Sequence, residues 1–151
     1  MEKFTIEQGR QILALQPFSV LLGTELTLLG EGTATLELPI TAQLKQQQGF
    51  VHGGVLAYLA DNALTYAAGT TMGLAVLTAD VKINYVRPAQ GERLIARASV
   101  IHAGKNQAVA RCDVFVRRAG GEEKLCACAQ GSVVRVASAS DPSNPPTRSS
   151  S

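Results

Sequence analysis

The chain has 151 residues, 46% of them hydrophobic, and a formal net charge of +2, which suits a single domain with a mainly aliphatic core. The small net charge and the lack of basic clusters interleaved with aromatics argue against a nucleic-acid or membrane partner. No run reaches transmembrane length, the N-terminus does not suit a signal peptide, and three cysteines imply no disulfide framework. We therefore expect a soluble cytoplasmic protein.

The N-terminal half begins with helical and then strand-like patterns. Residues 5–15 have apolar side chains at helical spacing, which predicts a short amphipathic helix that Pro17 ends. Residues 24–40 alternate apolar and polar side chains around two glycines, which predicts two strands joined by a tight turn, or one bent strand. Residues 41–51 are polar and loop-like, and residues 54–68 are rich in Ala and Leu over a length that favours a helix.

The second half is strand-like almost throughout. Alternating segments separated by short turns lie at 77–88, 93–104, 107–121 and 123–136. Turns this short predict that consecutive strands are antiparallel neighbours. Residues 137–151 are rich in Ser and Pro and are predicted to be disordered. Residues 1–136 are therefore expected to form one domain, with a helical segment over residues 1–20.

The order of these elements predicts an α+β fold, with one long apolar helix among antiparallel strands. A helix that is apolar on nearly every face needs cover on nearly every face. A curved antiparallel sheet wrapped around it would supply most of that cover, and a second copy of the chain would supply the rest.

Asp61 is the only charged side chain between Gly53 and Ala79, and its neighbours on the predicted helix are mostly Ala and Leu. A carboxylate in apolar surroundings is costly unless it is paired. Asp61 either meets a buried donor, reaches solvent at the helix edge, or serves as a general base or nucleophile, since such acids are enriched at active sites.

The sequence His52-Gly53-Gly54 stands directly before the long helix. The first turn of a helix carries free N–H groups and a partial positive charge, which would stabilise negative charge on a carbonyl oxygen. The alternative is an ordinary glycine-rich helix entry with a capping or buried histidine. His52 and Asp61 are nine residues apart, which is roughly 13 Å and half a turn on a helix. If both act on one atom, they come from different subunits of a two-fold dimer.

The combined motifs resemble those of hotdog-fold acyl-CoA thioesterases of the PaaI type (phenylacetic acid degradation type). The matching pieces span residues 20–136 and are Gly49-x-x-His52-Gly53-Gly54, Leu59-x-Asp61, Asp80-x-x-x-x-Tyr85-x-Arg87-Pro88-Ala89, Gly91 and Gly104-Lys105. The resemblance implies the hotdog fold, in which a curved antiparallel sheet wraps a long central helix. It also implies a homodimer with a shared sheet, assembled into a homotetramer.

The resemblance assigns roles to four positions. Asp61 would be the catalytic acid, as general base on water or as nucleophile, and the Gly53 N–H would polarise the thioester carbonyl. His52 would position the substrate or a neighbouring side chain, and Thr78 would hold the attacking water. Asp61 and Thr78 would come from one subunit, and His52 and Gly53 from the other.

One position departs from the family's pattern. Relatives commonly carry Asn six residues before the His, where this chain has Gln46. Glutamine offers the same amide donors on a longer stem, so Gln46 could be a second donor near the thioester oxygen. Gln47 or Gln48 could compete for that role, and the whole run could equally be a solvated loop.

Candidates for binding the substrate or the phosphates of coenzyme A are Gly54, Arg87, Lys105 and Asn106. For the last three, an ordinary solvated surface role is an open alternative. No cluster of metal ligands is apparent, so we expect no metal and no cofactor.

The sequence thus predicts a thioesterase that hydrolyses an aryl- or medium-chain acyl-CoA to a free acid and CoA. Two alternatives stay open. One is a hotdog protein that binds acyl-CoA without turning it over, whose function would survive Asp61→Asn. The other is a hotdog hydratase or dehydratase, which the absence of a histidine after Asp61 in the helix disfavours.

Overall fold

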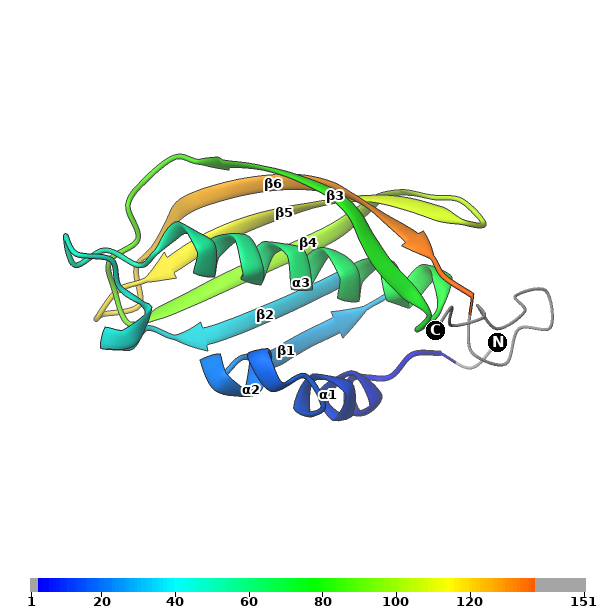
Figure 1. The fold of residues 1–151 in the computed structure, drawn as a ribbon, viewed down its shortest axis with the longest axis horizontal. Coiled ribbons are helices and arrows are strands. Elements are labelled where there is room, and N and C mark those ends of the chain that lie inside the picture. The colour runs from blue at the N-terminus through cyan, green and yellow to red at the C-terminus, as the bar shows by residue number, and fades with distance from the viewer. Residues whose placement is uncertain (1–2, 138–151) are drawn as a thin grey trace, which may run out of the picture.

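A computed structural model describes residues 3–137 and shows a six-stranded antiparallel sheet wrapped around one long helix (Figure 1). The elements in chain order are α1 (Ile6–Ala14), α2 (Pro17–Leu22), β1 (Glu25–Gly30), β2 (Thr33–Pro39), the 3-10 helix Ala42–Leu44, α3 (Gly53–Met72), β3 (Val76–Tyr85), β4 (Arg93–Ala103), β5 (Gln107–Arg117) and β6 (Glu123–Arg135). The tail predicted to be disordered lies outside the described residues, apart from residue 137. Within residues 3–137 no helix is long and apolar enough to cross a membrane.

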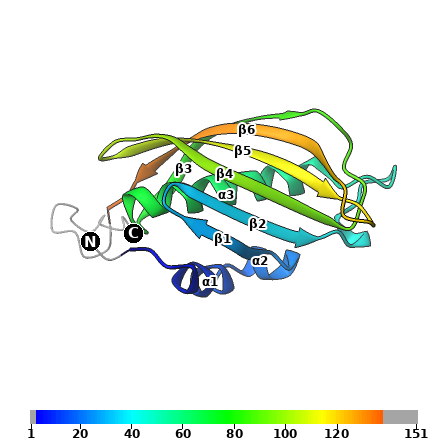
Figure 2. The same cartoon turned by 180° about the vertical axis from the view of Figure 1, so that it is seen from behind.

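The helix α3 lies against the concave face of the sheet, as Figures 1 and 2 show from opposite sides. Its sheet-facing side chains recur at helical spacing and are fully or almost fully buried, among them Leu56, Leu59, Ala60, Ala63 and Ala67. Burying one large aliphatic side chain stabilises the fold by about 1.5–3 kcal/mol, so this contact holds α3 firmly in place. The predicted helix over residues 54–68 is confirmed and extends one turn further.

Close approach between α3 and the sheet depends on Gly131 of β6. A Cβ atom at this position would collide with the carbonyl oxygen of Asp80 and lie 3.3 Å from Leu64 Cδ1. Only glycine therefore lets β6 lie this close to both its neighbouring strand β3 and α3.

Strand order is β1-β2-β4-β5-β6-β3, with every neighbouring pair antiparallel. The prediction that consecutive strands are neighbours is correct for β4, β5 and β6 but wrong for β3, which pairs with β6 rather than β4. The seven residues 86–92 can span about 23 Å, which is enough to cross the roughly 14 Å from β3 past β6 and β5 to β4. As a result β3 is an edge strand of the sheet.

The N-terminal segment contains two helices rather than one. A capping box of Thr5 and Gln8 begins α1, and the chain leaves α1 at Leu15. Pro17 does not simply end that helix, because it occupies the first turn of α2, where its fixed φ and missing N–H are suitable.

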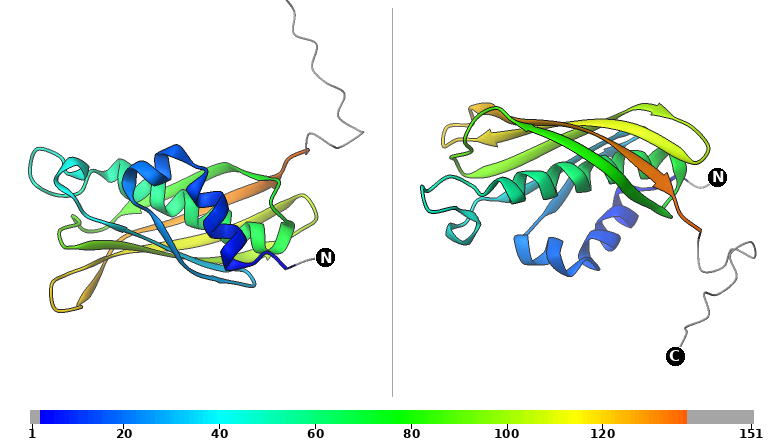
Figure 3. Two further views of the ribbon diagram at one scale, coloured as in Figure 1. Left: turned by 90° about the horizontal axis from the view of Figure 1, so that it is seen from below. Right: turned by 45° about the horizontal axis from the view of Figure 1, so that its top comes forward.

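These two helices lie beside the edge strand β1 and α3 (Figure 3), and Arg10 of α1 donates a hydrogen bond to the Leu26 carbonyl of β1. Tyr66 of α3 donates a hydrogen bond from its hydroxyl to the Gly9 carbonyl at 3.0 Å. Burial, with a smaller contribution from Tyr58, raises the pKa of Tyr66 to about 12, so this donor keeps its proton. The N-terminal segment therefore supplies part of the cover that the apolar helix needs.

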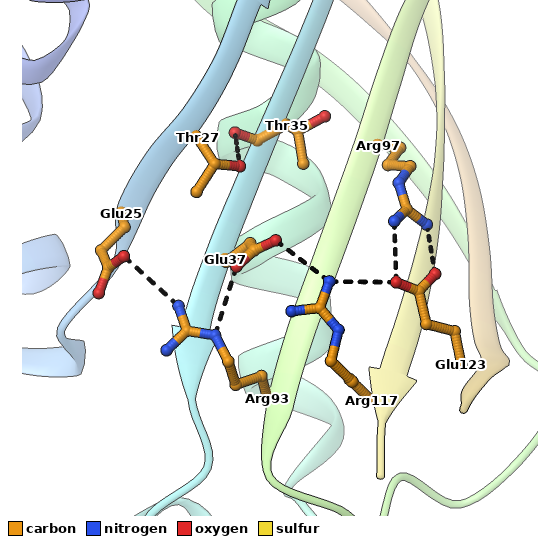
Figure 4. A network of polar contacts seen from close by, with 8 residues as sticks. All are labelled: Glu25, Thr27, Thr35, Glu37, Arg93, Arg97, Arg117 and Glu123. Atoms are coloured by element: carbon orange, nitrogen blue, oxygen red, sulfur yellow. Dashed lines mark hydrogen bonds and ion pairs between the residues drawn. The ribbon is translucent and has the colours of Figure 1, made fainter. Parts of the chain in front are cut away.

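The convex face of the sheet carries a network of six side chains that alternate in charge (Figure 4). In spatial order they are Glu25, Arg93, Glu37, Arg117, Glu123 and Arg97. Beneath them Ile95 is 0% exposed although it does not face α3, and the Arg97 guanidinium lies 5.0 Å from the Phe115 ring centroid. The stems of these long side chains therefore cover apolar surface while their ends pair with one another.

Candidate functional site

Asp61 lies near the middle of α3, half-buried on the flank of the helix that faces the edge strand β3. The Thr78 hydroxyl donates to Asp61 Oδ1 at 2.6 Å. The Thr65 hydroxyl oxygen is 2.8 Å from that of Thr78 and 3.0 Å from the Asp61 carbonyl oxygen. Asp61 is therefore held by a pair of hydroxyl groups and is not an isolated acid in an apolar helix.

The direction of these hydrogen bonds follows from proton counting. Each hydroxyl has one proton, so Thr78, which donates to the carboxylate, has none left for Thr65, and the proton of Thr65 is directed at the Asp61 carbonyl oxygen or shared with Thr78 Oγ1. The second oxygen of Asp61, Oδ2, has no donor within residues 3–137. Thr78 thus fixes the orientation of the carboxylate and leaves one oxygen able to accept a proton.

A β-bulge in β3 aims Thr78 at this acid. The register with β6 shifts between Thr78 and Asp80, so that these two residues face opposite sides of the sheet despite their spacing. Thr78 points toward α3, whereas Asp80 accepts a hydrogen bond from the Ser132 N–H at 2.8 Å. A regular strand would have turned both side chains to one face.

The start of α3 is a second polar region. His52 is exposed, and its Nδ1 accepts a hydrogen bond from the Gly54 N–H at 2.9 Å, so the ring caps the helix. In the neutral ring the proton is then on Nε2, which faces away from the helix. Within the described part of the chain, the Gly53 N–H has no acceptor, as expected for the first residue of a helix.

An open cleft of about 400 Å³ adjoins this helix start. Gly53 and Gln46 line it, together with Tyr85, whose hydroxyl donates to the Gly53 carbonyl at 3.1 Å. Gln46 is half-buried and its Oε1 accepts from the Gln48 N–H at 2.8 Å, which leaves its NH₂ group free for another acceptor. Gln48 is exposed and also lines the cleft, whereas Gln47 is exposed and does not line it.

The two regions do not meet in one chain. Gly53 and Asp61 are eight residues apart on α3, which corresponds to roughly 12 Å along the helix axis. Neither Asp61 nor Thr78 lines the cleft that contains Gly53. The structure therefore brings Asp61 together with Thr78, and brings Gly53 together with Gln46, but it does not join the two pairs.

The candidate phosphate-binding residues are also separated. Arg87 follows β3 beside the cleft, next to the point where Tyr85 pairs with Ala127. Lys105 and Asn106 form the β4–β5 turn, where the Asn106 carbonyl accepts from the Arg135 N–H. About 26 Å of β6 lies between these two ends, so Arg87 and Lys105 of one chain cannot bind the same phosphate.

Thr65 and Tyr85 were not expected among the site residues. Thr65 is four residues after Asp61, so helical spacing alone would have placed it on the same flank. Tyr85 belongs to the motif that carries the family resemblance, but its contact with Gly53 has no signal in the sequence. Within residues 3–137, no three His, Cys, Asp or Glu side chains gather in a group that could hold a metal ion.

Comparison with known sequences supports a common origin with esterases. The family model of the Thioesterase superfamily matches residues 48–122. A putative esterase from Haemophilus influenzae is 30% identical over 125 residues, which cover 82% of this chain and 87% of the relative. The acyl-coenzyme A thioesterase PaaI of Escherichia coli is 37% identical over 89 residues, which cover 58% of this chain and 63% of the relative.

Solved structures agree with this. A thioesterase family protein from Silicibacter pomeroyi superposes with a TM-score of 0.81 at 34% identity, covering 86% of this chain and 97% of its own. The Escherichia coli PaaI protein gives a TM-score of 0.77 at 26% identity, covering 87% of this chain and 92% of its own. The predicted hotdog fold and the resemblance to the PaaI type are confirmed. The chain belongs to the thioesterase superfamily.

Proposed function

We propose that the protein hydrolyses an aryl- or medium-chain acyl-CoA thioester to the free acid and CoA. The observation that carries this proposal is the half-buried Asp61 carboxylate, oriented by Thr78 at 2.6 Å and free at its other oxygen. The relative from Escherichia coli, an acyl-coenzyme A thioesterase, supports the same reaction.

In the proposed mechanism Asp61 Oδ2 takes a proton from a water molecule as the water attacks the carbonyl carbon of the thioester. The C–S bond of the resulting tetrahedral intermediate breaks, and the CoA thiolate takes the proton back from Asp61. In the alternative route, Asp61 itself attacks the carbonyl carbon of the thioester, the C–S bond breaks with release of the CoA thiolate, and water hydrolyses the resulting mixed anhydride. In ¹⁸O water, label in Asp61 after a single turnover would demonstrate the second route, with water attacking the Asp61 carbonyl carbon, because the first route never places label there.

The oxyanion would be stabilised at the start of α3. The Gly53 N–H is free and carries the positive end of the helix dipole, and the NH₂ group of Gln46 lies in the same cleft. His52 is proposed to position the substrate through Nε2. Gly54, which has no side chain, would leave room for the substrate close to the backbone. One such oxyanion donor contributes roughly 10²–10³ in kcat.

These groups meet if two copies pair through β3. Thr78 contacts Asp61 and Tyr85 contacts Gly53, and the two lie roughly 23 Å apart on the face of β3 that meets α3. Antiparallel pairing of two β3 edges about an axis near Val81 would set each Thr78 end beside the Tyr85 end of the partner subunit. The same register opposes Asp80 to Lys82 of the partner subunit, which is a favourable cross-strand pair.

The same dimer would complete the CoA site, since Lys105 and Asn106 of one subunit would approach Arg87 of the other. We propose a homodimer of this kind, assembled into a homotetramer. Sedimentation at assay concentration tests it, because a fully active species of 15.9 kDa would contradict a shared site. We also propose a cytoplasmic location, which is supported by the three unpaired cysteines and can be checked by cell fractionation.

The central experiment compares wild type with Asp61→Asn on a panel of aryl, short-, medium- and long-chain acyl-CoA esters. Asparagine keeps the oxygen that Thr78 contacts but cannot take up a proton. CoA release should fall by about 10²-fold or more on the preferred ester. Equal rates in the two proteins would eliminate this mechanism. No CoA release by wild type on any ester of the panel would instead favour a protein that binds acyl-CoA without turning it over.

A further inference from the structure

The side chain of Tyr85 contacts the backbone at Gly53, the residue whose N–H is proposed to polarise the thioester carbonyl. Tyr85 is the last residue of β3, and its hydroxyl donates to the Gly53 carbonyl at 3.1 Å. Its ring packs against the same residue, because a Cβ atom at Gly53 would lie only 3.3 Å from Tyr85 Cε1. Tyr85 therefore fills the space that a side chain at position 53 would occupy, and it also holds the carbonyl.

The peptide that follows Gly53 is held at both ends. Its oxygen, the Gly53 carbonyl oxygen, accepts from Tyr85, and its N–H, that of Gly54, donates to His52 Nδ1 at 2.9 Å. A carbonyl oxygen has two lone pairs, so it can accept from Tyr85 as well as from the helix. The plane of this peptide is therefore fixed by two side chains that do not belong to α3.

The peptide that precedes Gly53 is held at one end only. The His52 carbonyl accepts from the Val55 N–H at 2.9 Å, whereas the Gly53 N–H has no acceptor within residues 3–137. The direction of this N–H relative to the fixed peptide depends on the two backbone torsions of Gly53, and glycine restrains these torsions less than other residues do. A contact that immobilises Gly53 from outside the helix therefore also determines where its N–H points.

Backbone hydrogen bonds give Tyr85 a fixed base from which to make this contact. Directly after Tyr85, the Val86 N–H donates to the Cys126 carbonyl of β6 at 2.8 Å. The chain that enters α3 is tied to the same stretch, because the Val51 N–H donates to the Ala89 carbonyl at 3.0 Å. The end of β3 and the start of α3 are thus joined on both sides of the tyrosine.

We infer that Tyr85 is a positioning residue that aims the Gly53 N–H at the thioester oxygen, and that it serves the Asp61 of the partner subunit. The inference rests on the proposed thioesterase activity and on the proposed pairing of two β3 strands. In that dimer the Tyr85 end of one β3 would lie beside the Thr78 end of the other. Tyr85 is 53% exposed in the single chain, and the pairing would screen its contact with Gly53 from water.

The first test is Tyr85→Phe, which keeps the ring and removes only the hydroxyl. The Gly53 N–H stabilises charge that develops in the transition state, so kcat and kcat/KM should both fall by about 10-fold while KM changes by less than about twofold. Tyr58→Phe is the matched control, because the Tyr58 hydroxyl contacts Ser19 and Thr24 in the α2 region, and it should keep the wild-type kcat. An unchanged kcat in Tyr85→Phe, or an equal fall in Tyr58→Phe, overturns the inference.

Mixed dimers test whether Tyr85 acts across the interface. When Asp61→Asn and Tyr85→Phe are co-expressed in equal amounts, about half of the dimers should contain one chain of each kind. If Tyr85 serves the partner's Asp61, each mixed dimer has one intact site, and the mixture should reach about a quarter of the wild-type rate. If Tyr85 instead serves Asp61 of its own chain, no intact site forms and the rate should stay near about one twentieth, which overturns the inference.

Amide exchange measured by nuclear magnetic resonance gives a readout that needs no substrate. The peptide of the Gly54 N–H loses one of its two anchors in Tyr85→Phe, so this amide should exchange with solvent at least several-fold faster than in wild type, and Tyr58→Phe should leave it unchanged. Equal exchange in wild type and Tyr85→Phe overturns the inference. Failure of the proposed function would look different, because wild type would then release no CoA from any ester while the exchange of Gly54 still showed whether Tyr85 holds Gly53.

Discussion

Two half-buried carboxylates lie in different parts of the molecule, and their partners differ in charge. On the convex face, Glu37 lies between Arg93 and Arg117, at 3.3 and 3.6 Å. On the flank of α3, Asp61 is held by the neutral hydroxyl of Thr78, and no Lys or Arg within residues 3–137 pairs with it. Glu37 therefore has two cationic partners, whereas Asp61 has a neutral donor at one oxygen.

A hydroxyl partner orients the group without neutralising it. We expect the carboxylate of Glu37 to contribute to stability, and we propose that the carboxylate of Asp61 takes part in proton transfer. Changes to the partner of each carboxylate should accordingly affect different measurements.

After the loss of Asp61 itself, the largest effect is expected from Thr78→Val, which keeps the shape of the side chain and removes its hydroxyl. Asp61 would lose the donor that orients it, so kcat should fall by roughly 10-fold or more. Thr78→Ser retains the hydroxyl and should recover most of the rate. Steady-state kinetics on the preferred ester measures both. A fully active Thr78→Val would mean that the hydroxyl takes no part in the reaction.

The complementary change is Glu37→Gln, which should lower stability and leave kcat as it is. The side chain of Glu37 is 14% exposed, and its loss would leave Arg93 and Arg117 without their shared partner. We expect a loss of about 1–3 kcal/mol in the free energy of unfolding. Urea denaturation of wild type and variant gives this value. An equally stable variant would show that the network does not contribute measurably.

The smallest expected effect is a loss of stability at low pH. Hydrogen bonds from Arg97, then from Arg117, lower the pKa of Glu123 to about 2 from its usual 4.5. A depressed native pKa means that the unfolded chain binds the proton more readily, so this contribution to stability is complete above about pH 4.5 and is lost as the pH falls toward 2.

The size of this effect is limited because the pair is near the surface, and we expect about 1 kcal/mol or less. Urea denaturation at several pH values between 2 and 5 should show it. Glu123→Gln, which has no carboxylate at this position, should show a flatter pH dependence than wild type. If the two curves were parallel, Glu123 would not be responsible for the acid sensitivity.

Much of this fold could be predicted from local patterns. The apolar run in α3 and the alternation in the strands each extend over many residues, so the element types were predicted correctly. The neighbours of β3 were not predicted correctly, because alternation identifies a strand but does not show which strand lies beside it. Pro17 was predicted to end the first helix, and the second helix that begins at Pro17 was missed. Proline both stops one helix and suits the first turn of another.

The candidate site was predictable only in part. Asp61 stood out because it is the only charge in a long apolar run, and Thr78 came from the resemblance to a known family. The bulge that turns Thr78 toward Asp61 has no clear mark in the sequence, since no glycine or proline accompanies it. The contact of Tyr85 with Gly53 joins residues 32 positions apart, and no local pattern carries such a contact.

The placement of the first two helices has a consequence for how related chains could diverge. Phe4, Ile12 and Gln16 of the N-terminal segment line a cavity of about 110 Å³ together with Thr65 of α3, whereas Asp61 and Thr78 belong to α3 and β3. If this cavity receives the acyl group in the proposed reaction, substrate choice and bond cleavage would be encoded in separate parts of the gene. Exchanging only the opening segment between homologues would be a short evolutionary route to a new acid product with the same hydrolytic apparatus.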